Sequence, residues 1–567
     1  MPNFEPRPVY MQIFVYVGLL IGLTPLLGIY MANVFNGKHS FLHPILGWLE
    51  TLSYRFAGVN QKEEMTWPTY AKCLFVFNLL GFLFLFLLLL TQSYLPLNPE
   101  HLPATSWSLA FNTAISFTTN SSWQSYAGET TLSYLTQMLG ITVQSFLSGA
   151  TGLAVLLALI RGISRKTCET IGNFWVDIVR SIVYLFLPLS LIFAVVFVSE
   201  GVIQTFAPYV EITTLEKRSQ KIPLGPVASQ EAIKQLSGDG GGFFNANSAH
   251  PFENPTSLTN YLEMLALLLI PAASVYAFAS LIGSKQHGYM IFGVMLCLFI
   301  GGLAAAFFSE QVHNPSIGVY PVLEGQETRL GMPNSILGSF AATASSDGAV
   351  NAMVSSLTPL AGGVLMINMM IGEVVFGGIG VGLCSMIIFV LLTAFMCGLM
   401  VGRTPEYFGK KIEKQEMQWV ILAILVPSAL ALIGAGVSCV LPIALSSLSN
   451  QGPHGMSEIL YAFVSSAANN GSAFAGLNTN TDYYNLSLGV VMLVARATIL
   501  LSSVALAGLF AKKGIILPSL GTLSSHTPLF AVLLIGVIMI VGGLTFFSAL
   551  SLGPIVEHLL MVQGQIY

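Results

Sequence analysis

Four short polar stretches interrupt this otherwise hydrophobic chain, and each lies between two apolar runs long enough to cross a membrane. In chain order, as loops one to four, they read FTTNSSWQSY at 117–126, SGDGGGFFNANSAHPFENPT at 237–256, SSDGAVNAM at 345–353 and SSAANNGSAFAGLN at 465–478. Their central residues, Asn120, Gly240, Gly348 and Gly471, are 120, 108 and 123 positions apart. Non-helical backbone is tolerated at membrane depth only beside protein or a water-filled path. The spacing therefore predicts four repeats of span, re-entrant loop and span, as in a pore with approximate fourfold symmetry.

Ten apolar stretches are long enough to cross a bilayer, which needs about 20 residues per helix. They lie near 10–34, 69–95, 131–160, 177–200, 258–283, 288–308, 364–401, 418–446, 485–511 and 528–551. Only 8% of the 567 residues are charged, whereas a soluble chain has roughly 25%. We therefore expect an all-α integral membrane protein with a single membrane domain over 1–567. The four pseudo-symmetric repeats are predicted at 69–160, 177–283, 288–401 and 418–511, with extra helices at 10–34 and 528–551.

Short pore helices are predicted ahead of the loops, at about 105–117, 228–237, 334–344 and 456–467. A dehydrated potassium ion needs about eight oxygens in place of its water, and rings of backbone carbonyls supply them in known filters. Glycine accepts the unusual dihedrals that such a ring requires. Four loops in register favour this filter over ordinary glycine-rich outer loops. The candidate lining is Thr119, Asn120 and Ser121 in loop one, Gly238, Asp239, Gly240 and Gly241 in loop two, Ser346, Asp347 and Gly348 in loop three, and Ala468, Asn469, Asn470 and Gly471 in loop four.

Four ionisable residues at membrane depth have more than one candidate role. Asp239 and Asp347 either line the filter or turn outward and accept backbone N–H bonds. Arg496 lies well inside the ninth apolar run, where an arginine is costly and usually faces a cavity or a partner. It forms a positive barrier below the filter, pairs with a carboxylate such as Glu373, or belongs to a structural ion pair. Glu373 itself lies in the run 364–401, which is too long for one straight helix and contains Gly372, Gly377, Gly378, Gly380 and Gly382, so a break is predicted near 370–380.

The positions of the basic residues predict the orientation. One set of loops and helix ends carries Lys38, Arg55, Lys62, Lys72, Arg161, Arg165, Lys166, Arg180, Lys285, Arg403, Lys410, Lys411, Lys414, Lys512 and Lys513. The opposite side has only Arg7, Lys217, Arg218, Lys221, Lys234 and Arg329. Because cytoplasmic loops carry the excess of lysine and arginine, both termini and all four loops are expected outside.

The sequence also argues against two classes of partner. No basic cluster suggests nucleic-acid binding. The glycines at 240–242 lack the GK[ST] ending of a phosphate-binding loop, and the chain has no DKTGT-like aspartyl-phosphate motif. We therefore expect that this chain binds no nucleotide and that its surroundings are membrane lipid.

Six longer motifs resemble one family of membrane proteins along essentially the whole chain. They are GNFWVDIVRS at 172–181, HPFENPT at 250–256, EVVFGG at 373–378, RTPEYFGKKI at 403–412, GPHGMSEILYA at 452–462 and NNGSAFAGL at 469–477. These segments resemble the potassium-binding A subunit of the Kdp potassium-transporting ATPase. That family belongs to a superfamily of potassium transporters built from four channel-like repeats, which agrees with the repeats counted above.

The resemblance implies a division of labour in a bacterial cytoplasmic membrane. This subunit would capture external potassium in its filter and pass it through an intramembrane tunnel to a P-type ATPase B subunit, which hydrolyses ATP. A C subunit and a small F subunit are also expected. The resemblance implies filter positions at Gln124, Gly240, Gly348 and Gly471, and a gate in the broken helix near 370–380, which includes Glu373, Gly377 and Gly378.

The sequence departs from the family's pattern at two positions, and two other classes of function are alternatives to a pump subunit. Loop three has Asp347 where some relatives have cysteine, and loop four has Ala468 where some have a third asparagine. The main alternative is a passive potassium channel or gradient-driven transporter of the same superfamily, and a third is a membrane scaffold without an ion path. The motifs at 250–256 and 403–412 favour the pump subunit.

Overall fold

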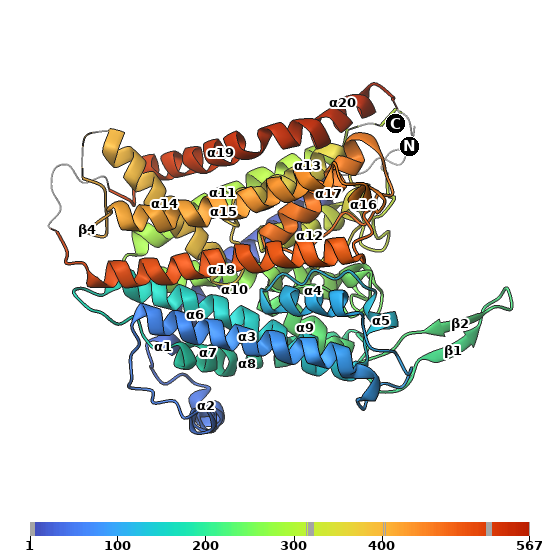
Figure 1. Ribbon diagram of the computed structural model, residues 1–567, viewed down its shortest axis with the longest axis horizontal. Coiled ribbons are helices and arrows are strands. Elements are labelled where there is room, and N and C mark those ends of the chain that lie inside the picture. The colour runs from blue at the N-terminus through green and yellow to red at the C-terminus, as the bar shows by residue number, and fades with distance from the viewer. Residues whose placement is uncertain are drawn as a thin grey trace.

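The chain is a bundle of long helices whose axes lie roughly along one common line (Figure 1). The computed structural model describes residues 6–312, 314, 315, 322–400, 402, 404–516 and 524–565. Within these ranges, ten helical segments are long and apolar enough to cross a membrane. They contain α1 (Pro6–Phe35), α3 (Trp67–Thr91), α6 (Val143–Ser164), α7 (Phe174–Arg180) with α8 (Leu187–Ser199), α10 (Ser257–Ile282), α11 (Lys285–Glu310), α14 (Val381–Met400), α15 (Lys414–Ser438), α18 (Asp482–Lys512) and α19 (Pro528–Leu550). The predicted all-α membrane fold is confirmed.

Four shorter helices precede the four loops, as the sequence predicts. They are α4 (Trp107–Thr118), α9 (Val227–Ser237), α12 (Met332–Ala344) and α17 (Gly452–Ala467). All four lie in the same half of the bundle, towards the end where the two chain termini are found (Figure 1). Most of their residues are buried because the long helices surround them. This placement brings the four loops together in the interior of the bundle.

The predicted break in the long run 364–401 is present. α13 (Pro359–Met370) ends before the glycine-rich segment, and α14 begins only at Val381. The ten residues between them, 371–380, form no helix and no strand. We call these residues the gate loop. It lies in the interior of the bundle, so its backbone N–H and C=O groups need hydrogen-bond partners from neighbouring protein.

An amphipathic helix that the sequence did not predict, α2 (His43–Ala57), connects α1 and α3. It is seen nearly end-on in Figure 1, across the direction of the spanning helices. Trp48 and Phe56 on one face are exposed, while Glu50 on the other is buried and accepts a hydrogen bond of 2.6 Å from the Tyr184 hydroxyl. The face with Glu50 attaches α2 to the bundle. The apolar face with Trp48 and Phe56 points outward, as in helices that lie in a membrane interface.

The remaining elements are short. They are α5 (Gly128–Thr131), α16 (Pro442–Leu445), α20 (Val556–Val562), the antiparallel pair β1 (Val210–Thr213) and β2 (Ser219–Ile222), the antiparallel pair β3 (Glu406–Tyr407) and β4 (Lys410–Lys411), π-helical turns at Thr136–Thr142, Ser181–Phe186 and Ser551–Ile555, and 3₁₀ turns at Gln92–Tyr94, Asn247–Ala249 and Val354–Ser356. The β1–β2 hairpin projects from one end of the molecule (Figure 1).

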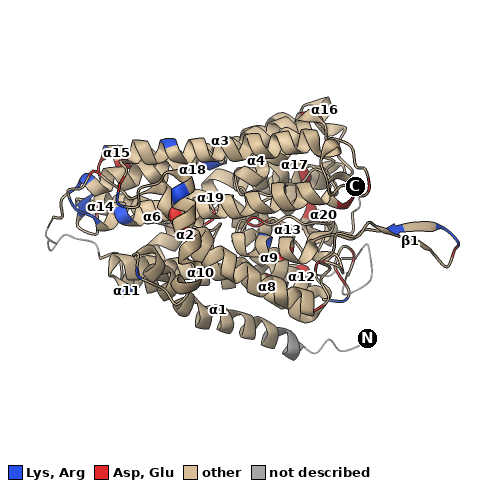
Figure 2. Cartoon of the chain, turned by 90° about the horizontal axis from the view of Figure 1, so that it is seen from below, with Lys and Arg blue, Asp and Glu red and all other residues tan. Residues whose placement is uncertain are grey.

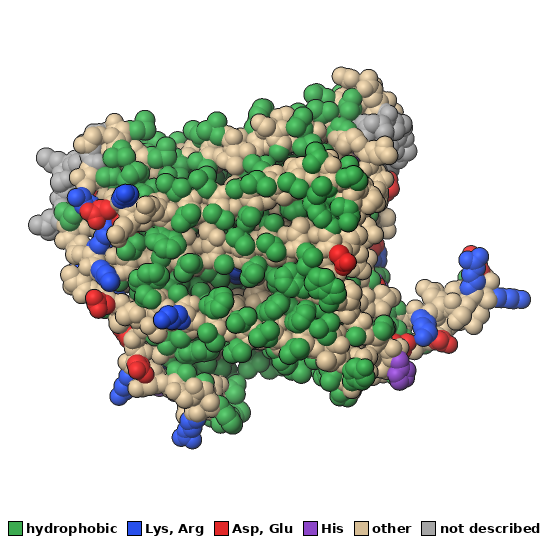
Figure 3. Space-filling model, viewed as in Figure 1, with side chains coloured by type: hydrophobic (Ala, Val, Ile, Leu, Met, Phe, Trp, Pro, Cys, Tyr) green, Lys and Arg blue, Asp and Glu red, His purple; other side chains and the backbone are tan. Residues whose placement is uncertain are grey.

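Charged and apolar side chains separate along the bundle. Hydrophobic side chains cover most of the middle of the face in Figure 3, and charged ones gather mainly towards its two ends. Lysine and arginine are concentrated at the end opposite the β1–β2 hairpin (Figure 2). There Lys410 is buried and donates to the carbonyls of Gly162 and Phe510, at 2.9 and 2.8 Å, which ties the ends of α6 and α18 together. Arg403, the first residue of the neighbouring motif, lies outside the described residues.

Candidate functional site

The four loops begin with the same backbone turn although their sequences differ. The residue at this turn is Asn120, Gly238, Ser346 or Asn469, with φ of 57°, 60°, 52° and 51°. Only one of the four is glycine, although left-handed backbone is unusual for other residue types. Four turns of one conformation, each at the end of a short helix, give the loops a common exit path.

A hydrogen bond that closes the helix end accompanies the turn in three loops. The backbone N–H groups of Ser121, Asp347 and Asn470 donate to the carbonyls five residues earlier, at 2.9, 3.0 and 2.9 Å. This bond, together with a left-handed residue before the donor, is the Schellman arrangement that ends many helices. In loop two the corresponding bond is displaced by one residue, and the N–H of Gly240 donates to Lys234 O at 3.3 Å.

Direct contacts join loop one to loop two and loop two to loop three. The side-chain amide of Asn120 donates to the carbonyl of Gly238, and the hydroxyl of Ser122 donates to the carbonyl of Asp239 at 2.5 Å. The same Asp239 carbonyl accepts the backbone N–H of Gly348 at 3.2 Å. These contacts join residues more than 100 positions apart, so the loops meet at one place.

Loop four completes the circle. The Asn470 amide donates to Ala342 O at the end of α12, 3.1 Å away, and the Asn469 amide donates to the Ser121 hydroxyl at 2.8 Å. A β-carbon added to Gly471 would lie 1.9 Å from Ser121 O. Each repeat therefore contacts the next in a closed ring, one-two-three-four-one, which we call the loop ring.

The other predicted lining residues lie in or beside the loop ring. Gln124 forms a pair of hydrogen bonds with the backbone of Gly242, at 2.9 and 3.0 Å, and so joins the outer parts of loops one and two. The Thr119 hydroxyl contacts the Ser121 hydroxyl at 2.9 Å, and Ala468 is the residue directly after α17. The carbonyl of Gly241 faces a lysine side chain rather than another loop, as described below.

The two loop carboxylates are in different surroundings. Asp347 Oδ1 accepts the backbone N–H of Ala349 at 2.8 Å, so this side chain turns back on its own loop. Neither carboxylate oxygen of Asp239 has a hydrogen-bond partner among the described residues, and both are fully buried. Arg496 is close enough to Asp239 to interact with it electrostatically.

The gate loop packs directly against the loop ring. The N–H of Gly377 donates to Ala344 O at the end of α12, at 2.7 Å. On its other side, a β-carbon added to Gly380 would lie 2.2 Å from Gly152 O in α6. Gly380 has φ of 76°, so both the space and the backbone favour glycine there. Glu373 and Phe376 also have left-handed backbone, at φ of 59° and 63°. Such conformations are concentrated at functional sites.

A cavity of about 50 Å³ opens beside the gate loop. Its wall includes Gly372 and Glu373 of the gate loop, Ala468 of loop four, Ser428 of α15 and Thr545 of α19. Both carboxylate oxygens of Glu373 are buried and have no hydrogen-bond partner among the described residues. The cavity is thus bordered by the gate loop, the start of loop four and the spanning helices α15 and α19.

Arg496 lies in α18, and it is 5% exposed. It interacts electrostatically with Glu373 and Asp239. Within the described part of the chain, no ion pair as close as 4.0 Å includes it. Direct pairing with Glu373, one of the alternatives that the sequence left open, is therefore absent, and the guanidinium acts on the carboxylates at longer range.

Two contributors to this site were not identified from the sequence. Ser122 donates to the carbonyl of Asp239, but a serine in a polar stretch carries no distinctive signal. Lys234 was counted with the charges of the outer side, yet its side chain is 2% exposed and lies behind loop two. Its position in a predicted re-entrant helix was the one indication that it would be buried.

Comparison with known proteins identifies similar chains over nearly the full length. The profile of a family described as the potassium-transporting ATPase A subunit matches residues 14–559. A potassium-transporting ATPase potassium-binding subunit from Rhodospirillum centenum is 50% identical over 563 residues, covering 98% of each chain. A protein of the same description from Sorangium cellulosum is 50% identical, and the match covers 98% of this chain and 99% of that one. Another from Pseudomonas entomophila is 49% identical, and the match covers 97% of this chain and 98% of that one.

Among solved structures, the potassium transporter TrkH from Vibrio parahaemolyticus has a similar fold. The TM-score is 0.51 at 14% sequence identity, and the match covers 86% of this chain and 97% of that one. At this identity the likeness concerns the fold alone.

Proposed function

The chain belongs to the family of potassium-transporting ATPase A subunits, and on this premise we propose that it binds external potassium in the loop ring and delivers it to an ATP-hydrolysing partner. The observation that carries the proposal is the closed circle of contacts among loops one to four. Four backbone turns of one conformation around a common centre are what a ring of carbonyl ligands requires.

In this proposal the filter is formed by the loop residues, and potassium is the transported ion. The candidate ligands lie in Thr119–Ser121, Gly238–Gly241, Ser346–Gly348 and Ala468–Gly471, with Gln124 at the outer edge. The short helices α4, α9, α12 and α17 end at these loops, so their partly negative C-terminal ends favour a cation there. Backbone carbonyls carry the binding, which explains why loops with different side chains can serve one ion.

The gate loop and its cavity support a sideways route for the ion. Gly377 and Gly378 are part of a segment that contacts the end of α12, and in this proposal that segment closes the direct way through the bundle. An ion below the filter would meet the carboxylate of Glu373 and the cavity beside it. Arg496 adds a positive charge that interacts with Glu373 and Asp239, and in this proposal it opposes straight passage of a cation. We infer that the ion leaves the filter through this cavity.

The proposed partners follow from the family. The relatives are described as potassium-binding subunits of a potassium-transporting ATPase, so ATP hydrolysis is assigned to a B subunit, and this chain binds no nucleotide. A C subunit and a small F subunit complete the proposed complex. The basic end of the bundle (Figure 2) is placed on the cytoplasmic side of a bacterial inner membrane, with the loops and both termini outside.

The test is the ATPase activity of the complex that copurifies with this chain in mild detergent, titrated with potassium and with sodium. We expect hydrolysis that low potassium stimulates and sodium does not. The alternative is a passive channel or gradient-driven transporter, to which the fold would also be suited. Absence of any copurifying ATPase, with potassium flux through the purified chain alone in vesicles, would overturn the pump assignment in its favour.

A further inference from the structure

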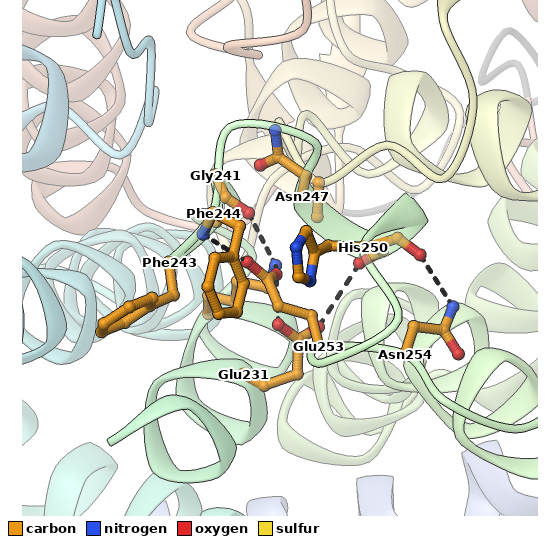
Figure 4. Close-up of polar contacts among 12 residues, drawn as sticks. Glu231, Gly241, Phe243, Phe244, Asn247, His250, Glu253 and Asn254 are labelled. Atoms are coloured by element: carbon orange, nitrogen blue, oxygen red, sulfur yellow. Dashed lines mark hydrogen bonds and ion pairs between the residues drawn. The ribbon is translucent and has the colours of Figure 1, made fainter. Parts of the chain in front are cut away.

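A cluster of four ionisable side chains lies buried behind residues 240–244 of loop two. Lys234 is in α9, and the glutamates Glu231, Glu253 and Glu263 surround it in the interior (Figure 4 labels two of them). The Lys234 ammonium lies 2.7 Å from Glu231 Oε2 and 2.6 Å from Glu253 Oε2. Removing an ammonium group from water costs several kcal/mol unless it is well paired. A lysine that is only 2% exposed therefore depends on these partners.

The cluster contacts the backbone of the filter at two points. The Lys234 ammonium donates to the carbonyl of Gly241 at 2.7 Å. Glu253 uses its second oxygen, Oε1, to accept the backbone N–H of Phe244 at 2.7 Å, and both bonds are drawn in Figure 4. The backbone carbonyl of Lys234 also accepts the N–H of Gly240. The return part of loop two, 240–244, is thus held by charged groups that are themselves fixed to one another.

The arrangement is found in only one of the four repeats. Within the four short helices, which are all described, α9 alone contains a lysine or an arginine. Loop two also has three consecutive glycines at 240–242, which makes its backbone the least restricted of the four. The most flexible loop is therefore the one that has a charged clamp behind it.

Resting on the proposed function, we propose that Lys234 is a positioning residue that sets the ion discrimination of the filter by fixing the Gly241 peptide, with Glu253 completing the clamp. A filter distinguishes cations by the spacing and field of its oxygens. Hydrogen bonds that include a charged group are roughly twice as strong as neutral ones. A loop held by two of them resists the change in spacing that a larger or smaller cation requires.

The two oxygens of Glu253 provide a sharp test, with Glu231 as the matched control. Glu253→Gln replaces one oxygen with an NH₂ group, so either the Phe244 N–H or the Lys234 ammonium loses its acceptor. Glu231→Gln is the same substitution beside the same lysine, but Glu231 contacts Gln235 and Ser248 and no residue of 240–244. Lys234→Met removes the bond to Gly241 itself. The copurified complex is titrated with potassium, rubidium and sodium, and its ATPase rate is measured.

We expect Glu253→Gln and Lys234→Met to raise the half-saturating potassium concentration about tenfold, which is about 1.4 kcal/mol. The rubidium-to-potassium ratio of half-saturating concentrations should approach one, while the maximal rate at saturating potassium stays within about twofold. Glu231→Gln should keep the discrimination of the unaltered complex. Assembly is measured by size-exclusion chromatography, and if Lys234→Met fails to assemble, Glu253→Gln decides.

Wild-type discrimination in an assembled Glu253→Gln complex would overturn the inference. An equal loss in Glu231→Gln and Glu253→Gln would overturn it as well, because the cluster would then act through charge or stability rather than through its contacts with residues 240–244. An unaltered complex without potassium-stimulated hydrolysis would instead contradict the proposed function, so the two failures are distinguishable.

Discussion

Replacing Gly471 with alanine is expected to weaken potassium binding because the added β-carbon meets the neighbouring loop. It would lie 1.9 Å from Ser121 O, whereas carbon and oxygen ordinarily approach to roughly 3.3 Å. Gly471 also has φ of 94°, and left-handed backbone costs an L-residue about 1–2 kcal/mol. Either the Ser121 carbonyl or the backbone of loop four must therefore move by more than about 1 Å. Both belong to the loop ring.

The magnitude follows if the variant relieves this strain in the ion-free state and has to restore the original ring geometry when the ion binds. The backbone term alone then raises the half-saturating potassium concentration by roughly 5- to 30-fold, since about 1.4 kcal/mol is a factor of ten. The assay is potassium-stimulated ATPase activity of the copurified complex, with rubidium measured in parallel. Gly301→Ala is the control, because no atom lies within 4 Å of its β-carbon position and its backbone is helical. It should leave both titrations unchanged.

Assembly separates this reasoning from a simple folding defect. The Gly471→Ala complex is compared with the Gly301→Ala complex by yield and by elution volume on size-exclusion chromatography. A well-assembled Gly471→Ala complex with the potassium affinity and rubidium discrimination of the control would show that the contact of loop four with Ser121 is not part of the ion site. The potassium filter would then have to be placed elsewhere.

Three further outcomes test other parts of the structure. Arg496→Ala should reduce potassium-stimulated turnover more than the yield of complex, because no direct ion pair among the described residues is lost with the charge; an equal fall in yield would support a structural role. Lys410→Met removes a hydrogen-bond donor to the ends of α6 and α18 and should lower the free energy of unfolding by about 2 kcal/mol, which would be measured as a lower Tm. Lys411→Met changes an exposed side chain and should leave the Tm unchanged. Burial lowers the pKa of His454, but its hydrogen bond with Glu557 outweighs burial and the pKa lies above its ordinary value. This pair therefore stabilises the protein fully below about pH 6.5 and less as the pH rises through the raised pKa. The Tm difference between the unaltered protein and His454→Gln should shrink with rising pH. A constant Tm difference would contradict this reasoning.

The spanning helices and the four short helices were predictable from the sequence because their signals are local. Each spanning helix is a long apolar run, and each short helix is a helix-forming segment that ends at a polar stretch. The break at 371–380 was predictable for the same reason, since glycines at 372, 377, 378 and 380 oppose a continuous helix. α2 was missed because its segment, 43–57, is too short and too polar for a span.

The alignment of equivalent residues between the four loops was harder to predict from the sequence. The sequence pattern aligned Asn120 with Gly240, Gly348 and Gly471, whereas the common left-handed turn aligns Ser122 with these three glycines. The difference of two residues arises because loop one has no glycine at the position where three loops have one. Ser122 nevertheless has φ of 48°. The register taken from composition therefore differs by two residues from the register of the backbone turns, and Ser122 contacts loop two at the position where the other loops have glycine.

The closure of the ring could not be predicted because its contacts differ at every junction. An asparagine amide and a serine hydroxyl join loops one and two, a backbone N–H joins two and three, and asparagine amides join three to four and four to one. A symmetric assembly of identical chains would repeat one junction four times. A single chain with four repeats can instead assign a separate task to each loop. Loop three then contacts the gate loop through the end of α12, while loop two alone has a buried lysine behind its glycines. We therefore expect that substitutions of Lys234 behind loop two will change ion discrimination, whereas substitutions at the contact between α12 and the gate loop will change turnover.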